Sequence, residues 1–224
     1  MERIFWLHLK KCAGTSLRDA LGDRYFETNR KEPMVFLGLD KSFWNDNLNN
    51  YRVPLGIFDY RRSLFAKTYL YTIEEWDSMH KICFVRNPYD RLISAYNYLR
   101  VREKKLLFAR VLPKKLGFYY FVKLIPQMLA TKRNRHFATH VAPIWGDISG
   151  ENGEILMDEI FRVEDLEKDE VLLKLSLLGF NNIERKNSTR SVNKRKSYYT
   201  SKSKALVDVY YAEDIVNLNY SYYD

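Results

Sequence analysis

The chain has 224 residues, of which 46% are hydrophobic and 15% aromatic, and its formal net charge is +9. This length and apolar content suffice for one sizeable core and predict a single domain over residues 1–224. Its two cysteines are too few for a disulfide framework, and the sequence contains neither an internal repeat nor a low-complexity linker. Disulfide-stabilised miniproteins and repeat proteins are therefore excluded, and the composition is compatible with a compact enzyme.

An apolar segment near the N-terminus, Ile4–Leu9, predicts a strand that leads through a turn of small residues into a helix near Thr15–Gly22. The turn carries a lysine, a glycine and two hydroxyls, and its small side chains would let backbone N–H groups approach an anion. The dipole of the following helix would add to such a site. Because the lysine precedes the glycine, the Walker pattern of ATP- and GTP-binding loops is absent. The predicted anion-binding residues are Lys11, Cys12, Ala13, Gly14, Thr15 and Ser16.

A second sequence of strand, turn and helix follows in KICFVRNPYDRLISAY. The run Ile82–Val85 predicts a strand, Arg86 lies at its end, and Pro88 is suited to the first turn of a helix near Tyr89–Lys105. Arg86 and Ser94 could both contact an anion if Ser94 lies on the helix face that is turned toward the strand end. Two anion sites, one in each motif, indicate a ligand with two separated phosphate-like groups.

The positive charge is concentrated in two segments of the chain. Residues 100–135 contain eleven Lys and Arg against one acid, and residues 185–204 contain eight Lys and Arg and no acid, which indicates anionic ligands. The first segment, with a helix near Phe118–Thr131, is interpreted as a basic helical insertion or substrate-side region. It could lie on a membrane surface, line a groove for an acidic polysaccharide, or present a solvated helix face. Nucleic acid is not expected as a partner, because no helix-turn-helix, zinc or RNP signature is present.

The remaining segments complete an alternation of strands and helices. Further elements are predicted as strands near Met34–Leu37, Leu55–Phe58 and Glu159–Val163, and as helices near Glu74–Ser78, Lys168–Leu178 and Ser201–Asn217. This alternation predicts an α/β fold with a P-loop-like central parallel sheet, helices on both faces, and ligands at the carboxyl ends of the strands. Both motifs lie at such strand ends.

The two motifs together resemble those of a known enzyme family. HLKKCAGTS, residues 8–16, resembles the 5′-phosphosulfate loop, and FVRNPYDRLISAY, residues 84–96, the 3′-phosphate motif, of sulfotransferases that use 3′-phosphoadenosine 5′-phosphosulfate (PAPS). The resemblance is strongest to the carbohydrate branch that includes heparan sulfate 2-O- and 6-O-sulfotransferases and the bacterial members of sulfotransferase family 2. DEIFRVEDL at 158–166 and NST at 187–189 look similar to the family's closing segments, so the resemblance spans nearly the whole chain.

The resemblance implies in-line transfer of a sulfuryl group from PAPS to a carbohydrate hydroxyl without a metal. Lys11 would stabilise the charge that develops on the oxygen between sulfur and the 5′-phosphate. Gly14, Thr15 and Ser16 would hold the 5′-phosphate, while Arg86 and Ser94 would hold the 3′-phosphate; Arg91 is either a ligand contact or a structural residue. A loop that closes over the nucleotide in relatives adds four candidate cofactor contacts, Lys186, Ser188, Arg190 and Lys194.

The base that activates the acceptor is less clearly marked. Relatives place a catalytic histidine on a strand that corresponds here to Gly56–Tyr60, and Ile57 occupies its position. Asp59 would point to the same face of a strand as Ile57 and could serve as the base. The alternative is an aspartate paired with Arg61 or Arg62, and Arg61 is also a candidate acceptor-binding residue.

Four histidines offer substitutes for the missing base. We expect His8 to be oriented by the sheet, and His80 has no motif support. His136 resembles a histidine that relatives use near the acceptor, so it is a second candidate base, and His136 and His140 are both candidate acceptor-binding residues. No metal site is predicted, because these histidines lack other ligands at the spacing of a zinc site.

Two other functions remain open at this point: a nucleotide-binding protein of this fold without turnover, and a nucleotide or sugar kinase. The acceptor would be a carbohydrate, with acidic polysaccharides and glycolipids as candidates.

No apolar run approaches the ~20 residues that span a bilayer, so we expect neither a signal peptide nor a membrane anchor. A cytoplasmic location, as in bacterial members, follows from this expectation, or the Golgi lumen if an anchor has been removed.

Overall fold

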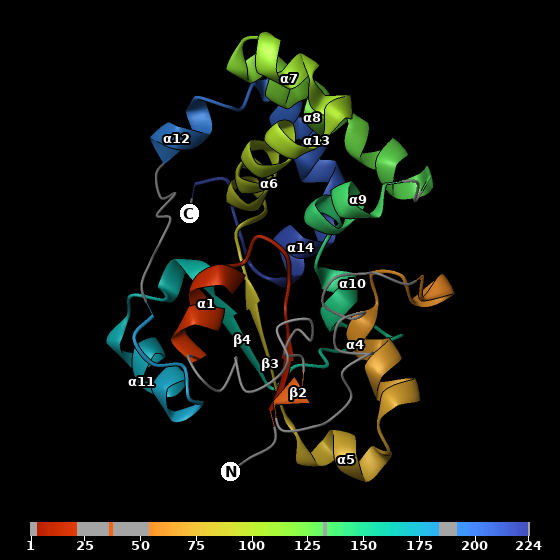
Figure 1. Ribbon diagram of the computed structural model, residues 1–224, viewed down its shortest axis with the longest axis vertical. Coiled ribbons are helices and arrows are strands. Elements are labelled where there is room, and N and C mark those ends of the chain that lie inside the picture. The colour runs from red at the N-terminus through yellow and green to blue at the C-terminus, as the bar shows by residue number, and fades with distance from the viewer. Residues whose placement is uncertain (1–3, 22–35, 38–53, 132–133, 184–191, 224) are drawn as a thin grey trace. The chain divides into compact units, whose positions relative to one another are not determined.

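The computed structural model describes residues 4–21, 36–37, 54–131, 134–183 and 192–223. The chain divides into two compact units (Figure 1). The sheet unit comprises Met1–Val85 and Gly146–Asn187, and the helical unit comprises Arg86–Trp145 and Ser188–Asp224. The first anion-binding motif belongs to the sheet unit, whereas Arg86 and the helix that follows it belong to the helical unit.

The sheet unit contains a mixed sheet with the strand order β2-β1-β3-β4. Its strands are β1 (Ile4–Leu7), β2 (Phe36–Leu37), β3 (His80–Val85) and β4 (Glu159–Arg162). The strands β1, β3 and β4 are parallel, with Leu7 opposite Cys83 and Val85 opposite Arg162, which confirms three of the predicted strands. The short strand β2 pairs with β1 in the antiparallel direction, so the predicted parallel sheet comprises β1, β3 and β4 and has one antiparallel edge strand.

One predicted strand, Leu55–Phe58, is absent, and Gly56–Phe58 forms a 3₁₀ turn instead. Gly56 adopts a positive φ of 64°, which breaks an extended strand, and the Asp59 carboxylate accepts a hydrogen bond from the Leu55 N–H at 3.0 Å. This side-chain hydrogen bond closes the turn locally and competes with pairing in a sheet.

Aromatic side chains cover both faces of the sheet. Neighbouring residues of β1 point to opposite faces, so Phe5 packs against Trp76, with ring centroids 5.1 Å apart, and Trp6 packs against Phe180 at 5.5 Å. Figure 1 shows helices on either side of the strands. The helices of this unit are α1 (Gly14–Leu21), α4 (Arg62–Phe65) with a π-helical turn (Ala66–Leu70), α5 (Ile73–Ser78), α10 (Trp145–Ile148), which begins at the unit boundary, and α11 (Asp169–Leu177).

The helical unit is built around α6 (Pro88–Arg102), whose start follows local sequence rules. Pro88 occupies the first turn, and the Asn87 side chain caps it by accepting a hydrogen bond from the Tyr89 N–H at 3.1 Å. The other helices are α7 (Phe108–Val111), α8 (Lys114–Thr131), α9 (Arg135–Val141), α12 (Val192–Lys196), α13 (Ser201–Tyr210) and α14 (Ala212–Asn217). The predicted single helix Ser201–Asn217 is therefore two helices that meet at Tyr211. No helix in the described ranges is long and apolar enough to cross a bilayer.

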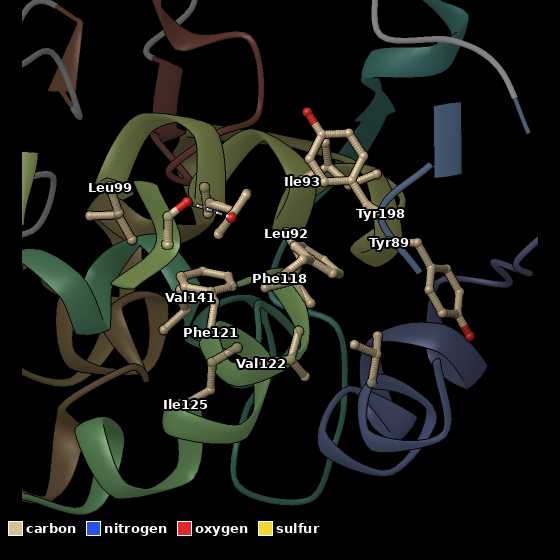
Figure 2. Close-up of a cluster of buried hydrophobic side chains, with 14 of the residues drawn as sticks. Tyr89, Leu92, Ile93, Leu99, Phe118, Phe121, Val122, Ile125, Val141 and Tyr198 are labelled. Atoms are coloured by element: carbon tan, nitrogen blue, oxygen red, sulfur yellow. Dashed lines mark hydrogen bonds between the residues drawn. The ribbon is translucent and has the colours of Figure 1, made fainter. Parts of the chain in front are cut away.

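The core of the helical unit is a cluster of aromatic and aliphatic side chains from α6, α8, α9 and α13 (Figure 2). Tyr96 is fully buried at its centre, and its hydroxyl donates to the Ala109 carbonyl at 3.2 Å, which satisfies its polar atom. Phe118 and Phe121 flank Tyr96, each with a ring centroid 5.3 Å away. This packing fixes α8 against α6.

Buried ion pairs connect segments that are distant in sequence. In the sheet unit, Arg62 and Asp147 form a salt bridge at 2.8 Å with side chains only 1% and 3% exposed. In the helical unit, Arg195 binds Asp90 through two hydrogen bonds of 2.9 and 2.7 Å. Removing one partner of such a pair leaves a buried charge without compensation.

We expect Arg62→Met to lower the free energy of unfolding by about 3–5 kcal/mol, because it leaves the buried Asp147 carboxylate without its positively charged partner. Lys204→Met is the control, since its ion pair with Asp208 is partly exposed and should contribute at most about 1 kcal/mol. Urea unfolding followed by tryptophan fluorescence measures both. Equal stability of the two variants would contradict this role of the buried pair.

Candidate functional site

The loop between β1 and α1 has a backbone conformation typical of anion-binding loops. Lys11 and Ala13 adopt positive φ angles of 67° and 59°, whereas Cys12 between them does not. Such alternation of left- and right-handed residues turns successive N–H groups toward one side and makes a concave site for an anion. The strained conformation of two non-glycine residues is consistent with a functional loop.

The N-terminus of α1 follows directly from this loop. The first helical hydrogen bond runs from the Leu17 N–H to the Ala13 carbonyl at 3.1 Å. The backbone N–H groups of Gly14, Thr15 and Ser16 precede this bond, so helix geometry gives them no carbonyl within the helix. Four of the six predicted residues, Ala13 to Ser16, thus surround a helix start that suits a phosphate group.

Gly14 is required by the close approach of a side chain. A Cβ atom at this position would lie 1.9 Å from Nε2 of His8, so the His8 ring occupies the space that any larger residue would need. His8 also lies beside Trp6, with ring centroids 5.6 Å apart. The expectation that His8 is held by the sheet agrees with this packing.

Arg62 also fixes this end of β1. Its guanidinium donates to the His8 carbonyl at 3.2 Å and to the Asp147 carboxylate at 2.8 Å, while the Arg62 backbone N–H donates to the other Asp147 oxygen at 3.1 Å.

The thiol of Cys83, on β3, is buried. Burial is the main cause, and the nearby Cys12 thiol a smaller one, of a Cys83 pKa well above its usual range. Cys83 is therefore protonated at neutral pH and unsuited to nucleophilic chemistry.

The segment that contains the first candidate base is a turn. Asp59 is half-buried and its carboxylate accepts from the Leu55 N–H, as described above. Ile57, which the resemblance aligns with a catalytic histidine of relatives, is 84% exposed. Arg61 donates a long hydrogen bond of 3.5 Å to the Gly150 carbonyl. The strand alternation that suggested Asp59 does not exist here, although its chemical role stays a prediction.

In the helical unit, the second motif places its residues at the start of α6. Arg86 is 8% exposed and precedes Asn87, which donates from its side chain to the Ser221 carbonyl at 2.8 Å. Ser94 is half-buried and lies one helical turn beyond Asp90 on the same face. Arg91 is 2% exposed and donates to the Ala142 carbonyl at 2.5 Å, which supports the structural interpretation of this residue.

Residues 194–198, from the second basic segment, pack against the face of α6 that carries Ser94. Arg195 binds Asp90, one turn before Ser94, and the hydroxyl of Tyr198 lies 2.9 Å from the Asn97 amide nitrogen, three residues after Ser94. These contacts bring the partly exposed Lys194 of α12 to the same part of the helical unit. The other three candidate contacts of this segment, Lys186, Ser188 and Arg190, lie outside the described residues.

His136 belongs to a hydrogen-bonded group at the far end of α6. Its Nδ1 atom lies 2.5 Å from the carboxylate of Glu103, and its Nε2 atom lies 3.5 Å from the hydroxyl of Tyr98. Glu103 is in turn held by the Asn134 amide at 2.6 Å. With Glu103 accepting from Nδ1–H, the lone pair resides on Nε2, as a general base requires. The His136 side chain is 44% exposed, so a substrate can reach it.

His140 has a different environment from His136. It is 7% exposed, stacks on Tyr98 with ring centroids 4.7 Å apart, and has Nδ1 2.6 Å from the His136 carbonyl. The guanidinium of Arg102 also lies over the Tyr98 ring at 4.2 Å. His140 thus supports the His136 group, while its contact with an acceptor stays a prediction.

The roles of three residues at these sites were not identified from the sequence. Glu103 is the one acid in a basic segment and could have been singled out for that reason. Arg195 and Arg62 depend on partners 105 and 85 residues away, and no local pattern identifies such pairs.

We expect Gly14→Ala to lower the melting temperature and perturb the loop, because its Cβ would overlap the His8 ring. The double variant His8→Ala, Gly14→Ala should recover most of the loss, since it removes the overlapping atoms. Thermal unfolding of the two single variants and the double variant measures this coupling. Additive losses would contradict the contact.

A comparison with models of protein families gives one match. The model described as "Sulfotransferase family" matches residues 1–223. No curated protein and no solved structure showed significant similarity to the chain. Since the match covers nearly every residue and includes both motifs, the chain belongs to the sulfotransferase family and is a transferase of sulfuryl groups.

Proposed function

We propose that this protein transfers a sulfuryl group from PAPS to a hydroxyl of a carbohydrate acceptor. Membership of the sulfotransferase family supports the sulfuryl transfer. The observation that carries the choice of donor is the loop Lys11–Ser16, in which a lysine and a left-handed backbone precede a helix N-terminus without the Walker order. Such a loop suits a 5′-phosphosulfate better than the triphosphate of a kinase substrate.

Lys11 acts on the reacting end of the donor. During in-line displacement, negative charge develops on the oxygen that links sulfur to the 5′-phosphate. A lysine beside that oxygen stabilises the transition state more than the ground state. The N–H groups of Gly14, Thr15 and Ser16 bind the 5′-phosphate at the start of α1.

The helical unit supplies the contacts to the 3′-phosphate, which distinguishes this donor from ADP and ATP. Arg86 and Ser94 bind this group, with Lys194 adding positive charge from α12. Asp90 does not oppose the phosphate, because its carboxylate is neutralised by Arg195. Lys186, Ser188 and Arg190 complete the proposed set of cofactor contacts.

His136 is the base that removes the proton from the acceptor hydroxyl. Among the candidates it has the arrangement that general-base catalysis needs: a carboxylate on Nδ1 and a side chain that is 44% exposed. Asp59 remains the second candidate, with its carboxylate already engaged by the Leu55 N–H. Arg61 and His140 are proposed to contact the acceptor.

The direct test is transfer of radiolabelled sulfate from PAPS to a panel of oligosaccharides by the full chain. We expect Lys11→Ala to lower the rate of transfer by about 10²–10³-fold, the usual effect of losing one group that stabilises transition-state charge. Lys10→Ala is the matched control and should retain nearly full activity. A Lys11→Ala enzyme that transfers sulfate at the wild-type rate would refute the proposed role, and binding of donor without transfer to any acceptor would favour a protein without turnover.

We expect His136→Asn to lower kcat by about 10²–10⁴-fold while the affinity for the donor stays unchanged. Glu103→Gln should have a smaller effect, about 10–100-fold, because it removes the charge that orients the imidazole but leaves the base in place.

The control for this pair is His80→Asn, which removes another histidine that lies beside a carboxylate, Glu159, at 3.5 Å. This variant should transfer sulfate like the wild type. If Asp59→Asn abolished transfer and His136→Asn did not, Asp59 would be the base.

A further inference from the structure

Two large apolar side chains of α8 face away from the core. The inner side of this helix carries Phe118, Phe121 and Ile125, which are buried in the cluster of Figure 2. Leu116 and Tyr120 lie on the opposite side of the helix and are 41% and 43% exposed. They share this outer side with Lys123 and Gln127, so the exposed face of α8 carries both apolar and polar side chains.

A pocket of about 490 Å³ opens between this side of α8 and α7. Its size falls in the range of small-molecule sites, ~300–1,000 Å³. The lining is mainly aromatic and aliphatic, and the two polar residues come from α8. The lining residues are Phe108, Leu112, Tyr120, Lys123, Leu124 and Gln127.

Aliphatic side chains project into solvent beside the pocket. Val111 is 85% exposed and Leu107 is 54% exposed, and each directly precedes a residue that lines the pocket, Leu112 and Phe108. Leu107 and Val111 are four residues apart in a helical stretch, so they share one face. Water-exposed aliphatic residues grouped around an apolar pocket mark an interaction site.

The chain segment that forms the pocket is strongly basic. Residues 100–135 carry eleven Lys and Arg, and their one acid, Glu103, is engaged by His136 and Asn134. Lys123 lies at the pocket itself, and Lys115 is exposed at the start of α8. A partner of this surface is therefore anionic as well as apolar.

We propose that α7 and the outer side of α8 dock the protein onto an anionic lipid bilayer, with an acyl chain entering the pocket. Lysines on this surface would meet lipid head groups, while Leu107, Val111 and Leu116 would insert at the level of the first methylene groups. A soluble acidic polysaccharide fits less well, because it would satisfy the lysines and leave the aliphatic residues and the apolar pocket in water. The proposal does not depend on the donor or acceptor of the transfer reaction.

The first experiment is co-sedimentation of the full chain with vesicles of phosphatidylcholine alone or mixed with phosphatidylglycerol. We expect binding to the anionic vesicles and little to the neutral ones. Lys115→Gln and Lys123→Gln should each weaken binding about fivefold, and Leu107→Ser and Val111→Ser about tenfold each. Val209→Ser and Val216→Ser are matched controls, because these residues are 72% and 73% exposed on α13 and α14, and they should bind like the wild type.

Failure to sediment with anionic vesicles would overturn the proposal. So would a Leu107→Ser, Val111→Ser double variant that binds as tightly as the wild type, because binding through charge alone would assign the surface to a soluble polyanion.

A second measurement tests the pocket. In a Tyr120→Trp variant, the new indole lies at the pocket wall, and lipids brominated on the acyl chain should quench its fluorescence in anionic vesicles. Quenching should disappear when the same variant also carries Leu107→Ser and Val111→Ser. Binding to vesicles without quenching at position 120 would exclude entry of a chain into the pocket.

Discussion

The guanidinium of Arg62 fixes the end of β1, and the loop Lys11–Ser16, the proposed binding site of the donor, starts from there. The guanidinium donates to the His8 carbonyl and to the Asp147 carboxylate, and the Arg62 backbone N–H at the start of α4 donates to the same carboxylate. Two residues after Leu9, the backbone turns left-handed at Lys11, and His8 lies against Gly14. The loop is thus defined by a buried charge on one side and by a close side-chain contact on the other. Pre-organisation of this kind lowers the cost of orienting the group that stabilises the transition state.

Helix α6 has the corresponding role in the helical unit. Its first turn binds Arg195 through Asp90, its middle carries Ser94, and the residue after its last turn, Glu103, orients His136. One rigid element therefore holds the proposed contact to the 3′-phosphate and the proposed base. The aromatic cluster around Tyr96 packs this helix against α8, so the outer side of α8 is tied to the same framework.

Local sequence signals predicted much of this structure. The strands at Ile4–Leu7 and His80–Val85 and the start of α6 follow from apolar runs and from the Asn-Pro cap, and the family follows from the two motifs. The failures have physical reasons. The segment Leu55–Phe58 has strand-like composition, but Gly56 and the Asp59 hydrogen bond stabilise a turn. The Glu103–His136 pair joins residues 33 apart that become neighbours only when α9 packs near the end of α6, so no periodicity reveals it.

The central claim is that the donor carries a 3′-phosphate bound by the start of α6. Calorimetric titration with 3′-phosphoadenosine 5′-phosphate and with ADP tests it most directly, because both carry two phosphates and differ in where the second one is attached. We expect about 10–100-fold tighter binding of the 3′-phosphorylated nucleotide, the contribution of hydrogen bonds to a charged group, and loss of this preference in Arg86→Ala. Equal affinity of the wild-type protein for the two nucleotides would show that α6 does not bind a 3′-phosphate.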